Sequence, residues 1–212
     1  MARDLGFVGE PNSPGWMEAR QSRIGGSDIG AICGWSRFDT REEIIQRKLG
    51  NLPEKALTPA MDRGNRLEEP VLLWLQDKLG LQIDRDAHKH TFVHDEHDWM
   101  VYNPDGIAYT DDGTMIVLEA KTCSDRSTEF MWGRAGGQKF PTSYQAQVTW
   151  GMGIMGCKTA YLGVLRGAIN GRPDLGFDKY LMHFDKTAFA TLQAKGQEAF
   201  DEMTERKGLL WD

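Results

Sequence analysis

The sequence contains little cysteine, no long hydrophobic run and no low-complexity segment. Its three cysteines, Cys33, Cys123 and Cys157, are odd in number and far apart, which argues against a disulfide framework and against a zinc or iron–sulfur cluster. No stretch approaches the roughly 18 apolar residues that a membrane span needs, and residues 1–6 lack the apolar core of a signal peptide. We therefore expect a cytoplasmic protein without a membrane partner.

No internal repeat or Pro/Ser-rich linker divides the chain, so residues 1–212 are expected to form one domain. A hydrophobic content of 40% is sufficient for a core. The net charge of -6 is unfavourable for general binding to a polyanion. A site that binds divalent cations nevertheless needs carboxylates, and a local basic loop can hold nucleic acid within an acidic protein. The overall charge therefore neither requires nor excludes nucleic acid.

Three helices are predicted in the N-terminal part of the chain, after a glycine- and proline-rich entry. The first is a short helix preceded by a glycine turn within 22–32, and the other two have the approximate ranges 41–49 and 61–79. Ser27 or Asp28 is the expected N-cap of the first helix, because a short side-chain oxygen can accept hydrogen bonds from the free N–H groups of a first turn. Residues 40–43 match a capping box, and Gly80 is placed to end the third helix.

The middle of the chain changes to short apolar segments separated by polar turns, which predicts an antiparallel β-meander. The expected strands are 91–93, 100–102, 107–109 and 115–121. Beyond a loop, the remaining elements are expected at 143–155 (helix), 159–165 (strand), 179–184 (strand) and 187–207 (helix). This order favours an α/β (α+β) fold with a central mixed β-sheet flanked by helices. The apolar stripe of the last helix, which includes Phe189 and Leu192, is expected to pack in the core.

One predicted core strand carries two charged residues. The segment 116–121 is apolar, yet it places Glu119 and Lys121 on one face, because residues two apart in a strand point the same way. Upstream, Asp-Asp-Gly at 111–113 is a good hairpin turn, and a three-residue loop would set Asp105 opposite Glu119. A loop of two or four residues would place the Asp105 side chain on the opposite face of the sheet from Glu119, so this register is a checkable prediction.

Two neighbouring carboxylates repel each other, and a divalent cation between them removes that conflict. Asp105, Glu119 and the carbonyl of Ala120 could bind Mg²⁺, which would polarise a phosphate and lower the pKa of an attacking water. Lys121 could orient that water or stabilise negative charge. These parts suit hydrolysis of a phosphodiester bond. Residues 103–106 are also an ordinary turn sequence, and Glu-x-Lys is an ordinary pair at a strand edge, so a purely structural interpretation stays open.

A resemblance to a known family covers most of the chain. Pro104-Asp105 with Glu119-Ala120-Lys121 resembles the PD-(D/E)xK nuclease signature. Four further segments are similar to motifs of the phage lambda exonuclease branch, also called YqaJ-like viral recombinases. They are the W-x-x-x-R and I-G-(G/A)-S-D elements within 16–31, G-x-S-x-(F/Y) at 34–38, G-x-x-x-E at 64–68 and P-x-x-Y-x-x-Q at 141–147. The order and spacing of these segments make the resemblance specific.

The resemblance implies a restriction-endonuclease-like PD-(D/E)xK core with Asp105, Glu119 and Lys121 as its catalytic residues. The implied cofactor is Mg²⁺, for which Mn²⁺ can substitute. The implied metal ligands are Glu68, Asp105, Glu119 and Ala120. The implied site thus extends the pattern found in the strand by one carboxylate from the preceding helix.

Glu68 also stands out by its own surroundings. It lies on the same helical stripe as Leu72 and Leu75, and a lone carboxylate on an apolar face is costly unless it is paired or binds a metal. Glu69, one residue further around the helix, is the alternative assignment.

The resemblance further implies that Arg20 and Ser27 bind a terminal 5′-phosphate and that Gln147 helps to place the nucleic acid. Arginine offers a forked donor, and a helix N-terminus attracts anions, so these roles are physically reasonable. The alternatives are a solvated Arg20 and a plain helix cap at Ser27. One departure concerns the helix of Gln147: many relatives carry Q-x-Q there, whereas this chain has Thr149 at the second position.

Other features carry less information. The chain has two closely spaced histidine pairs, His88/His90 and His94/His97. Neither pair has a third ligand at suitable spacing, so a zinc site is not expected. The loop at 126–140 combines Trp132 with Arg134 and several glycines, which is compatible with a DNA contact and equally with a plain surface loop.

The leading hypothesis is a DNA exonuclease of a bacterial or phage-infected cell. It would degrade one strand of linear duplex DNA, 5′ to 3′ from a 5′-phosphorylated end, and generate single-stranded DNA for recombination. The family implies double-stranded DNA ends and a single-strand annealing protein as partners, and a ring-shaped homo-oligomer such as a trimer. The alternatives are a PD-(D/E)xK endonuclease that cuts internally and a catalytically inactive DNA-binding module.

Overall fold

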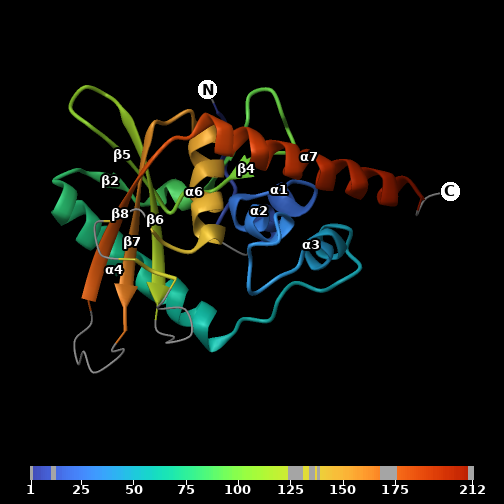
Figure 1. The fold of residues 1–212 in the computed structure, drawn as a ribbon, viewed down its shortest axis with the longest axis horizontal. Coiled ribbons are helices and arrows are strands. Elements are labelled where there is room, and N and C mark those ends of the chain that lie inside the picture. Colours follow the sequence, from blue (N-terminus) through green and yellow to red (C-terminus); the bar gives the residue numbers. More distant parts are fainter. Residues whose placement is uncertain are drawn as a thin grey trace.

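A five-stranded sheet forms the centre of the fold (Figure 1). The computed structural model describes residues 2–10, 13–123, 131–133, 137, 139–167 and 176–209. The strand order is β2 (Ile83–Asp84), β5 (Gly106–Tyr109), β6 (Met115–Cys123), β7 (Thr159–Arg166) and β8 (Gly176–His183). β6 and β7 are parallel, and the other neighbours are antiparallel. The predicted mixed sheet is therefore confirmed.

A second sheet has three strands in the order β1 (Arg3–Phe7), β3 (His90–Val93) and β4 (Val101–Tyr102), with the 3-10 helix η1 (Asp86–Lys89) before β3. The prediction of one continuous meander is wrong here, because the chain changes sheet between β4 and β5. Pro104 has no N–H to donate to a ladder and restricts the residue before it, so pairing cannot continue through this point. We call residues 103–105 the corner.

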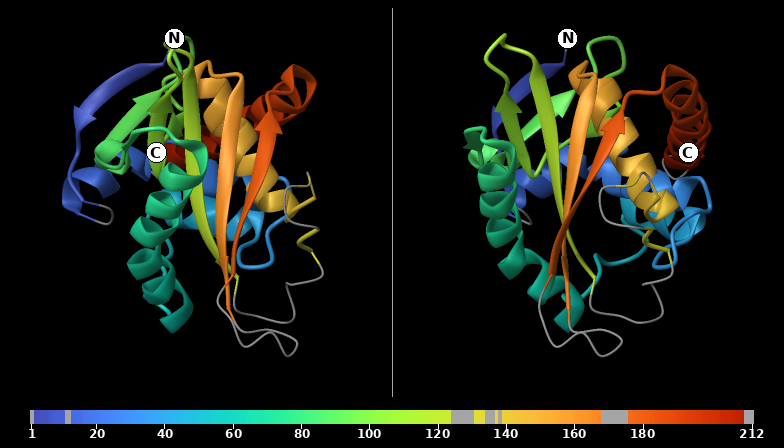
Figure 2. Two further views of the ribbon diagram at one scale, coloured as in Figure 1. Left: turned by 90° about the vertical axis from the view of Figure 1, so that its left-hand side faces the viewer. Right: turned by 60° about the vertical axis from the view of Figure 1, so that its left-hand side comes forward.

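Helices cover both faces of the five-stranded sheet (Figure 2). α4 (Pro59–Leu79) packs on one face, and α6 (Thr142–Met155) lies on the other, with α7 (Lys186–Leu209) against α6. The helices α1 (Pro14–Gln21), α2 (Gly26–Ile32) and α3 (Arg41–Lys48) complete the second layer, in which α2 packs on α6. No helix in the described part of the chain is long and apolar enough to cross a membrane.

Two helix starts differ from the prediction. The N-cap of α2 is Gly25 rather than Ser27 or Asp28. The Asp28 carboxylate instead accepts a hydrogen bond from the Gly25 N–H at 2.8 Å, from inside the first turn. α4 begins two residues earlier than expected, at Pro59 with Thr58 as N-cap, because the fixed φ of proline suits the first position of a helix.

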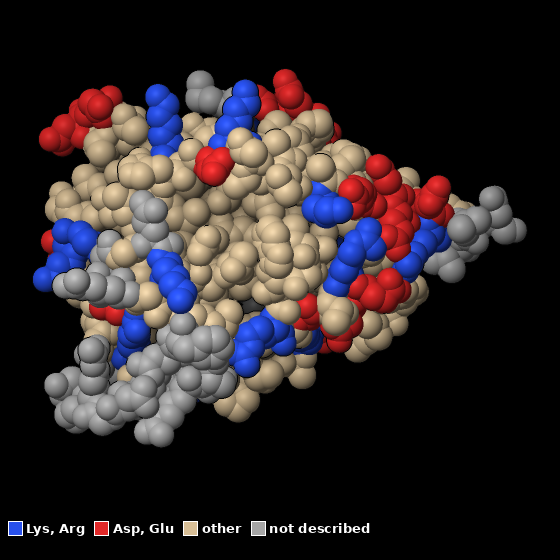
Figure 3. All heavy atoms as spheres, viewed as in Figure 1, with Lys and Arg blue, Asp and Glu red and all other residues tan. Residues whose placement is uncertain are grey.

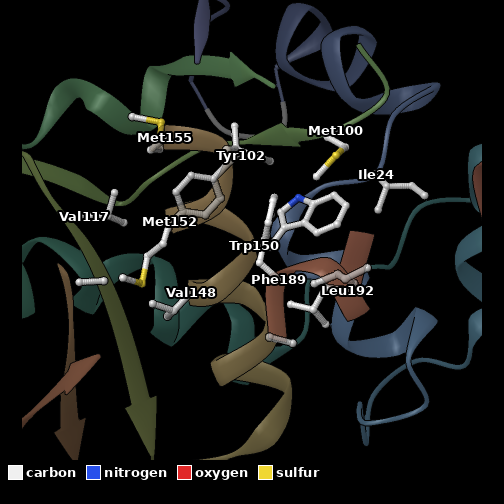
Figure 4. Packing of buried hydrophobic residues seen from close by; sticks show 14 of the residues in the cluster. Ile24, Met100, Tyr102, Val117, Val148, Trp150, Met152, Met155, Phe189 and Leu192 are labelled. Atoms are coloured by element: carbon white, nitrogen blue, oxygen red, sulfur yellow. The ribbon is translucent and has the colours of Figure 1, made fainter. Parts of the chain in front are cut away.

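Apolar side chains fill both sides of the sheet. Val71 of α4 lies so close to β7 that a Cβ on Gly163 would come within 2.7 Å of it. On the other side, the core around α6 includes Phe189 and Leu192 of α7 (Figure 4). The predicted core role of the apolar stripe on α7 is therefore confirmed.

Tyr102 is among the largest fully buried side chains, and its ring lies against α6 (Figure 4). A Cβ on Gly151 of α6 would come to 2.3 Å from ring carbon Cζ, and one on Gly26 of α2 to 3.1 Å from Cδ2. Glycine inside a helix costs about 0.5–1 kcal/mol relative to alanine. The buried ring explains why a glycine occupies the middle of α6.

We therefore expect Gly151→Ala to destabilise the protein. The added methyl group overlaps the Tyr102 ring, and overpacking of a rigid core costs about 1–3 kcal/mol. Gly208→Ala on α7 is the matched control, since no atom lies within 4 Å of a Cβ at that position. Denaturant unfolding measures both variants. Equal free energies of unfolding for Gly151→Ala and the wild type would contradict the close packing of Gly151 against the Tyr102 ring.

Candidate active site

The β5–β6 hairpin brings Asp105 and Glu119 side by side. The strands have the register expected for a three-residue turn, with Ile107 opposite Val117. Asp105 immediately precedes β5, and its Oδ2 accepts a hydrogen bond from the Ala120 N–H at 2.7 Å. The predicted register is confirmed, and it places the Asp105 carboxylate next to the two charged residues of β6.

Glu119 is fully buried, and three side chains donate hydrogen bonds to its carboxylate. The Tyr102 hydroxyl donates to Oε1 at 2.5 Å. Lys121 Nζ and Gln147 Nε2 donate to Oε2 at 2.7 and 2.8 Å. A buried charge is tolerated only when it is paired and hydrogen-bonded, and these donors meet that requirement from β4, β6 and α6.

The Lys121 ammonium lies among oxygen atoms at the inner end of a cleft. Besides Glu119, it contacts the Ala120 carbonyl at 3.1 Å and Asp105 Oδ2 at 3.6 Å. Burial by itself would lower the pKa of Lys121, but the two carboxylates outweigh it and hold that pKa well above its usual value. Lys121 is therefore a permanent positive charge at neutral pH.

Glu68 reaches this cleft from α4. It lines the same cavity of about 560 Å³ as Asp105, Ala120 and Lys121. Glu69 is the more exposed neighbour and pairs with Arg85. The geometry therefore brings Glu68, rather than Glu69, to the charged residues of β6.

Two of the carboxyl groups have raised pKa values. Burial, followed by repulsion from Asp105, raises the pKa of Glu68 to about 8. The same two causes raise the pKa of Glu119 to about 7. The positive charge of Lys121 lowers both pKa values, but its effect is smaller than the combined effect of burial and Asp105. Three carboxyl groups thus compete for one ammonium at this end of the cleft.

The residues present suit a hard divalent cation. Glu68, Asp105 and Glu119, with the Ala120 carbonyl, offer only oxygen donors, which Mg²⁺ prefers. Among the described residues, no three Asp, Glu, His or Cys side chains already form a ligand cluster. The ammonium of Lys121 lies between Glu119 and Asp105 instead. The donor set fits a metal, but its side chains are gathered around a lysine.

A second polar cluster surrounds Arg20, at the end of α1. Its Nη2 donates to Ser27 Oγ at 2.8 Å, and its Nη1 donates to Asn103 Oδ1 at 2.9 Å. The guanidinium also stacks over Trp16, 4.6 Å from the ring centroid. Arg20 is thus held by three residues, and the interpretation of Arg20 as a solvated surface side chain is wrong.

Asp28 and Lys48 extend this cluster inward. Lys48 Nζ forms an ion pair with Asp28 Oδ2 at 2.9 Å and also donates to the Arg20 carbonyl at 3.0 Å. Burial would raise the pKa of Asp28, but the two cations outweigh it and keep that pKa low. With two cations and one carboxylate, the cluster has a net positive charge beside the first turn of α2.

Three residues of these clusters were not predicted from the sequence: Tyr102, Asn103 and Lys48. Tyr102 and Asn103 directly precede the Pro-Asp pair, and a polar residue at the end of an apolar strand was the available signal. Lys48 had no comparable signal, because its pairing with Asp28 depends on how α3 packs against α2. Each missed residue contacts a residue that is distant in the sequence: Tyr102 contacts Glu119, Asn103 contacts Arg20, and Lys48 contacts Asp28.

Trp132 is not placed for the DNA contact with which the sequence of its loop is compatible. Its side chain is buried and packs against Phe140, Tyr144 and Tyr180, so its ring faces are taken up by the protein. Residues 126–130, together with Arg134, lie outside the described residues.

The histidines of the two pairs have partners outside the carboxylate cleft. His90 Nδ1 contacts Asp4 Oδ2 at 2.9 Å, and His94 and His97 lie with ring centroids 5.0 Å apart. Neither contact involves a residue of the cleft.

A mixed sheet with Asp105 before one strand and with Glu119 and Lys121 on the central strand is the restriction-endonuclease-like PD-(D/E)xK core. Within that class, the chain belongs to the family of YqaJ-like viral recombinase domains, whose model matches residues 15–158. It is 29% identical over 155 residues to the uncharacterized protein YqaJ of Bacillus subtilis (strain 168). That match covers 72% of this chain and 46% of YqaJ, so the chain spans about half the length of this curated relative.

Solved structures share the fold. An alkaline exonuclease, LHK-Exo from Laribacter hongkongensis, superposes with a TM-score of 0.68 at 16% identity, covering 93% of this chain and 96% of that one. LHK-Exo in complex with dAMP gives a TM-score of 0.71 with the same identity and coverage. A phage related exonuclease from Haemophilus somnus 129PT gives 0.58 at 13% identity, covering 87% of this chain and 96% of that one. At these identities the likeness establishes the fold.

The raised pKa of Glu68 predicts a pH-dependent stability. The folded state keeps the proton up to about pH 8, whereas the unfolded state releases it near the usual value of 4.5. The contribution of protonated Glu68 to the free energy of unfolding is thus fully present below pH 4.5 and is lost as the pH rises towards 8. In EDTA, we expect Tm to fall less steeply over this range for Glu68→Gln than for the wild type.

Glu69→Gln is the matched control, because it removes the same charge from the adjacent, exposed position. Thermal unfolding of the three proteins at a series of pH values provides the measurement. Parallel Tm curves for Glu68→Gln and Glu69→Gln would show that Glu68 does not titrate in this way.

Proposed function

We propose that this chain is a divalent-metal-dependent DNA exonuclease that hydrolyses one strand of linear duplex DNA. One observation carries the proposal: Glu68, Asp105 and Lys121 line a single cleft, with Glu119 hydrogen-bonded directly behind Lys121. Membership of a viral recombinase family and the fold of known exonucleases support it. We further propose that residues 1–212 act as one nuclease domain.

Magnesium is the proposed cation, with manganese as a substitute. Glu68, Asp105, Glu119 and the Ala120 carbonyl would hold it, and it would supply polarisation of the scissile phosphate and a more acidic water. Lys121 would then donate its hydrogen bonds to the phosphate or the water rather than to its present oxygen partners. Its raised pKa keeps it protonated for that role.

The Arg20 cluster is the proposed binding site for a terminal 5′-phosphate, which would give 5′ to 3′ polarity. Arg20 and Ser27 present polar hydrogens beside the first turn of α2, where the backbone N–H groups favour an anion. The two clusters are linked through the corner, since Asn103 contacts Arg20 and Asp105 belongs to the carboxylate cleft. Gln147, which donates a hydrogen bond to Glu119, is proposed to help place the nucleic acid near the metal.

The charge of the surface bears on how DNA is held. On the face seen in Figure 3, acidic side chains gather towards the end of α7, while lysines and arginines are scattered. A ring-shaped homo-oligomer, such as a trimer, would enclose the duplex and does not require one broad basic face on each subunit. We propose this assembly, with a single-strand annealing protein as the recipient of the product.

Substitution of the central residues tests the activity. We expect Asp105→Asn and Lys121→Ala each to lower the rate of mononucleotide release from linear duplex by about 100-fold or more, because each removes a charge that faces the reacting phosphate. End-labelled duplex with Mg²⁺ is the substrate. Glu69→Gln, outside the cleft, should retain the wild-type rate. Full activity in both central variants would overturn this assignment of the active site.

The Arg20 cluster is tested by the chemistry of the DNA end. Charge-assisted hydrogen bonds contribute about 1.5–3 kcal/mol, so Arg20→Ala should lower the rate on 5′-phosphorylated duplex by about 10-fold or more at low substrate concentration. Its rate on 5′-hydroxyl duplex should change little, which provides an internal control. Equal losses on both substrates would argue against a phosphate site.

Covalently closed circular DNA separates the alternatives. An enzyme that requires an end leaves closed circles intact, whereas an endonuclease of the same fold linearises them. Tight binding of linear duplex without turnover in Mg²⁺ or Mn²⁺ would instead identify an inactive DNA-binding module.

A further inference from the structure

Tyr102 connects the two sheets at the candidate active site. It belongs to β4, where it pairs with Phe92 in the three-stranded sheet. Its hydroxyl reaches Glu119 on β6 of the five-stranded sheet at 2.5 Å. The contact therefore joins the two sheets next to the corner at which the chain passes from one to the other.

The surroundings of Tyr102 hold a flat ring in one place. Gly26 of α2 and Gly151 of α6 lie so close to the ring that a methyl group at either position would press on it. Figure 4 shows the ring against α6 within the apolar cluster. A ring confined between two helices points its hydroxyl in a fixed direction, and that direction is towards Glu119.

The donors divide the two oxygens of the Glu119 carboxylate between them. Lys121 and Gln147 both donate to Oε2, on the side of the cleft. Tyr102 donates to Oε1, and Glu119 is closed to solvent. A buried oxygen without a donor is costly, so loss of the phenol would favour rotation of the carboxylate away from its present partners.

We propose that Tyr102 is a positioning residue, whose hydroxyl fixes the Glu119 carboxylate so that Oε2 faces Lys121 and the cleft. This inference rests on the proposed function, in which Glu119 is a ligand of the divalent cation. Tyr102 acts through Glu119 and contacts neither the substrate nor the cation itself. The two glycines, Gly26 and Gly151, form a narrow slot that holds the Tyr102 ring in the orientation in which its hydroxyl reaches Glu119.

Tyr102→Phe isolates the hydroxyl, because phenylalanine fills the same slot. We expect it to fold cooperatively and to bind linear duplex in EDTA as the wild type does. Loss of such an indirect ligand contact typically weakens metal affinity or activity about 10–100-fold. We therefore expect the Mg²⁺ concentration for half-maximal hydrolysis to rise, or turnover at saturating Mg²⁺ to fall, within that range.

Tyr180→Phe is the matched control. Tyr180 is also fully buried, and its hydroxyl donates to the Gly133 carbonyl at 3.0 Å and accepts from Arg166, with no contact to the carboxylate cleft. Both variants lose a buried phenolic hydrogen bond, so both should lower Tm. Only Tyr102→Phe should change the Mg²⁺ dependence. Wild-type Mg²⁺ dependence and turnover in Tyr102→Phe, or equal changes in the two variants, would overturn the proposal.

Calorimetric titration with Mn²⁺ gives a readout that does not depend on hydrolysis. If the wild type binds Mn²⁺ but degrades no DNA, the proposed function fails, while weaker Mn²⁺ binding by Tyr102→Phe than by Tyr180→Phe still supports the positioning role. Equal Mn²⁺ affinities in the two variants, or no Mn²⁺ binding by the wild type, overturn that role.

Discussion

The structure depends on one constraint: a carboxylate, Glu119, is placed in the interior of a core strand. A fully buried charge needs donors, and β6 by itself supplies only Lys121. The others come from β4 through Tyr102 and from α6 through Gln147. The packing of α6, and the reach of β4 across the two sheets, are therefore tied to the same buried group. Burial of that group also raises the pKa of Glu119.

The corner at 103–105 serves both polar clusters. Pro104 ends the pairing of β4, and the residues on either side of it point to different partners. Asn103 accepts a hydrogen bond from Arg20, whereas Asp105 accepts one from the backbone of Ala120. A single short segment thus connects a cationic cluster to the carboxylates of the cleft. Under the proposed function, the cationic cluster would bind a phosphate directly, whereas the carboxylates would act on a phosphate only through a divalent cation.

The fold is retained among proteins whose sequences have diverged to 16% identity or less. Such divergence is tolerated because a core accepts different apolar side chains when volume and patterning are preserved. The charged residues of β6 have less freedom, since each of them is satisfied by named partners. In this chain, the slot formed by Gly26 and Gly151 adds a requirement of its own, because it suits the ring of Tyr102.

Local pattern by itself determined most of the helices and strands and the register of the β5–β6 hairpin, although it missed β1, α1 and β2. Alternation in β6 and the Asp-Asp-Gly turn placed Asp105 level with Glu119, because the side-chain period of a strand is two and the turn sets the parity. The helical stripe also singled out Glu68, although only packing excluded Glu69 by directing it to Arg85. Sequence spacing holds no information about contacts between distant elements. For that reason the change of sheet at the corner, the Lys48–Asp28 pair, the burial of Trp132 and the hold of Tyr102 on Glu119 were decided by the tertiary structure alone.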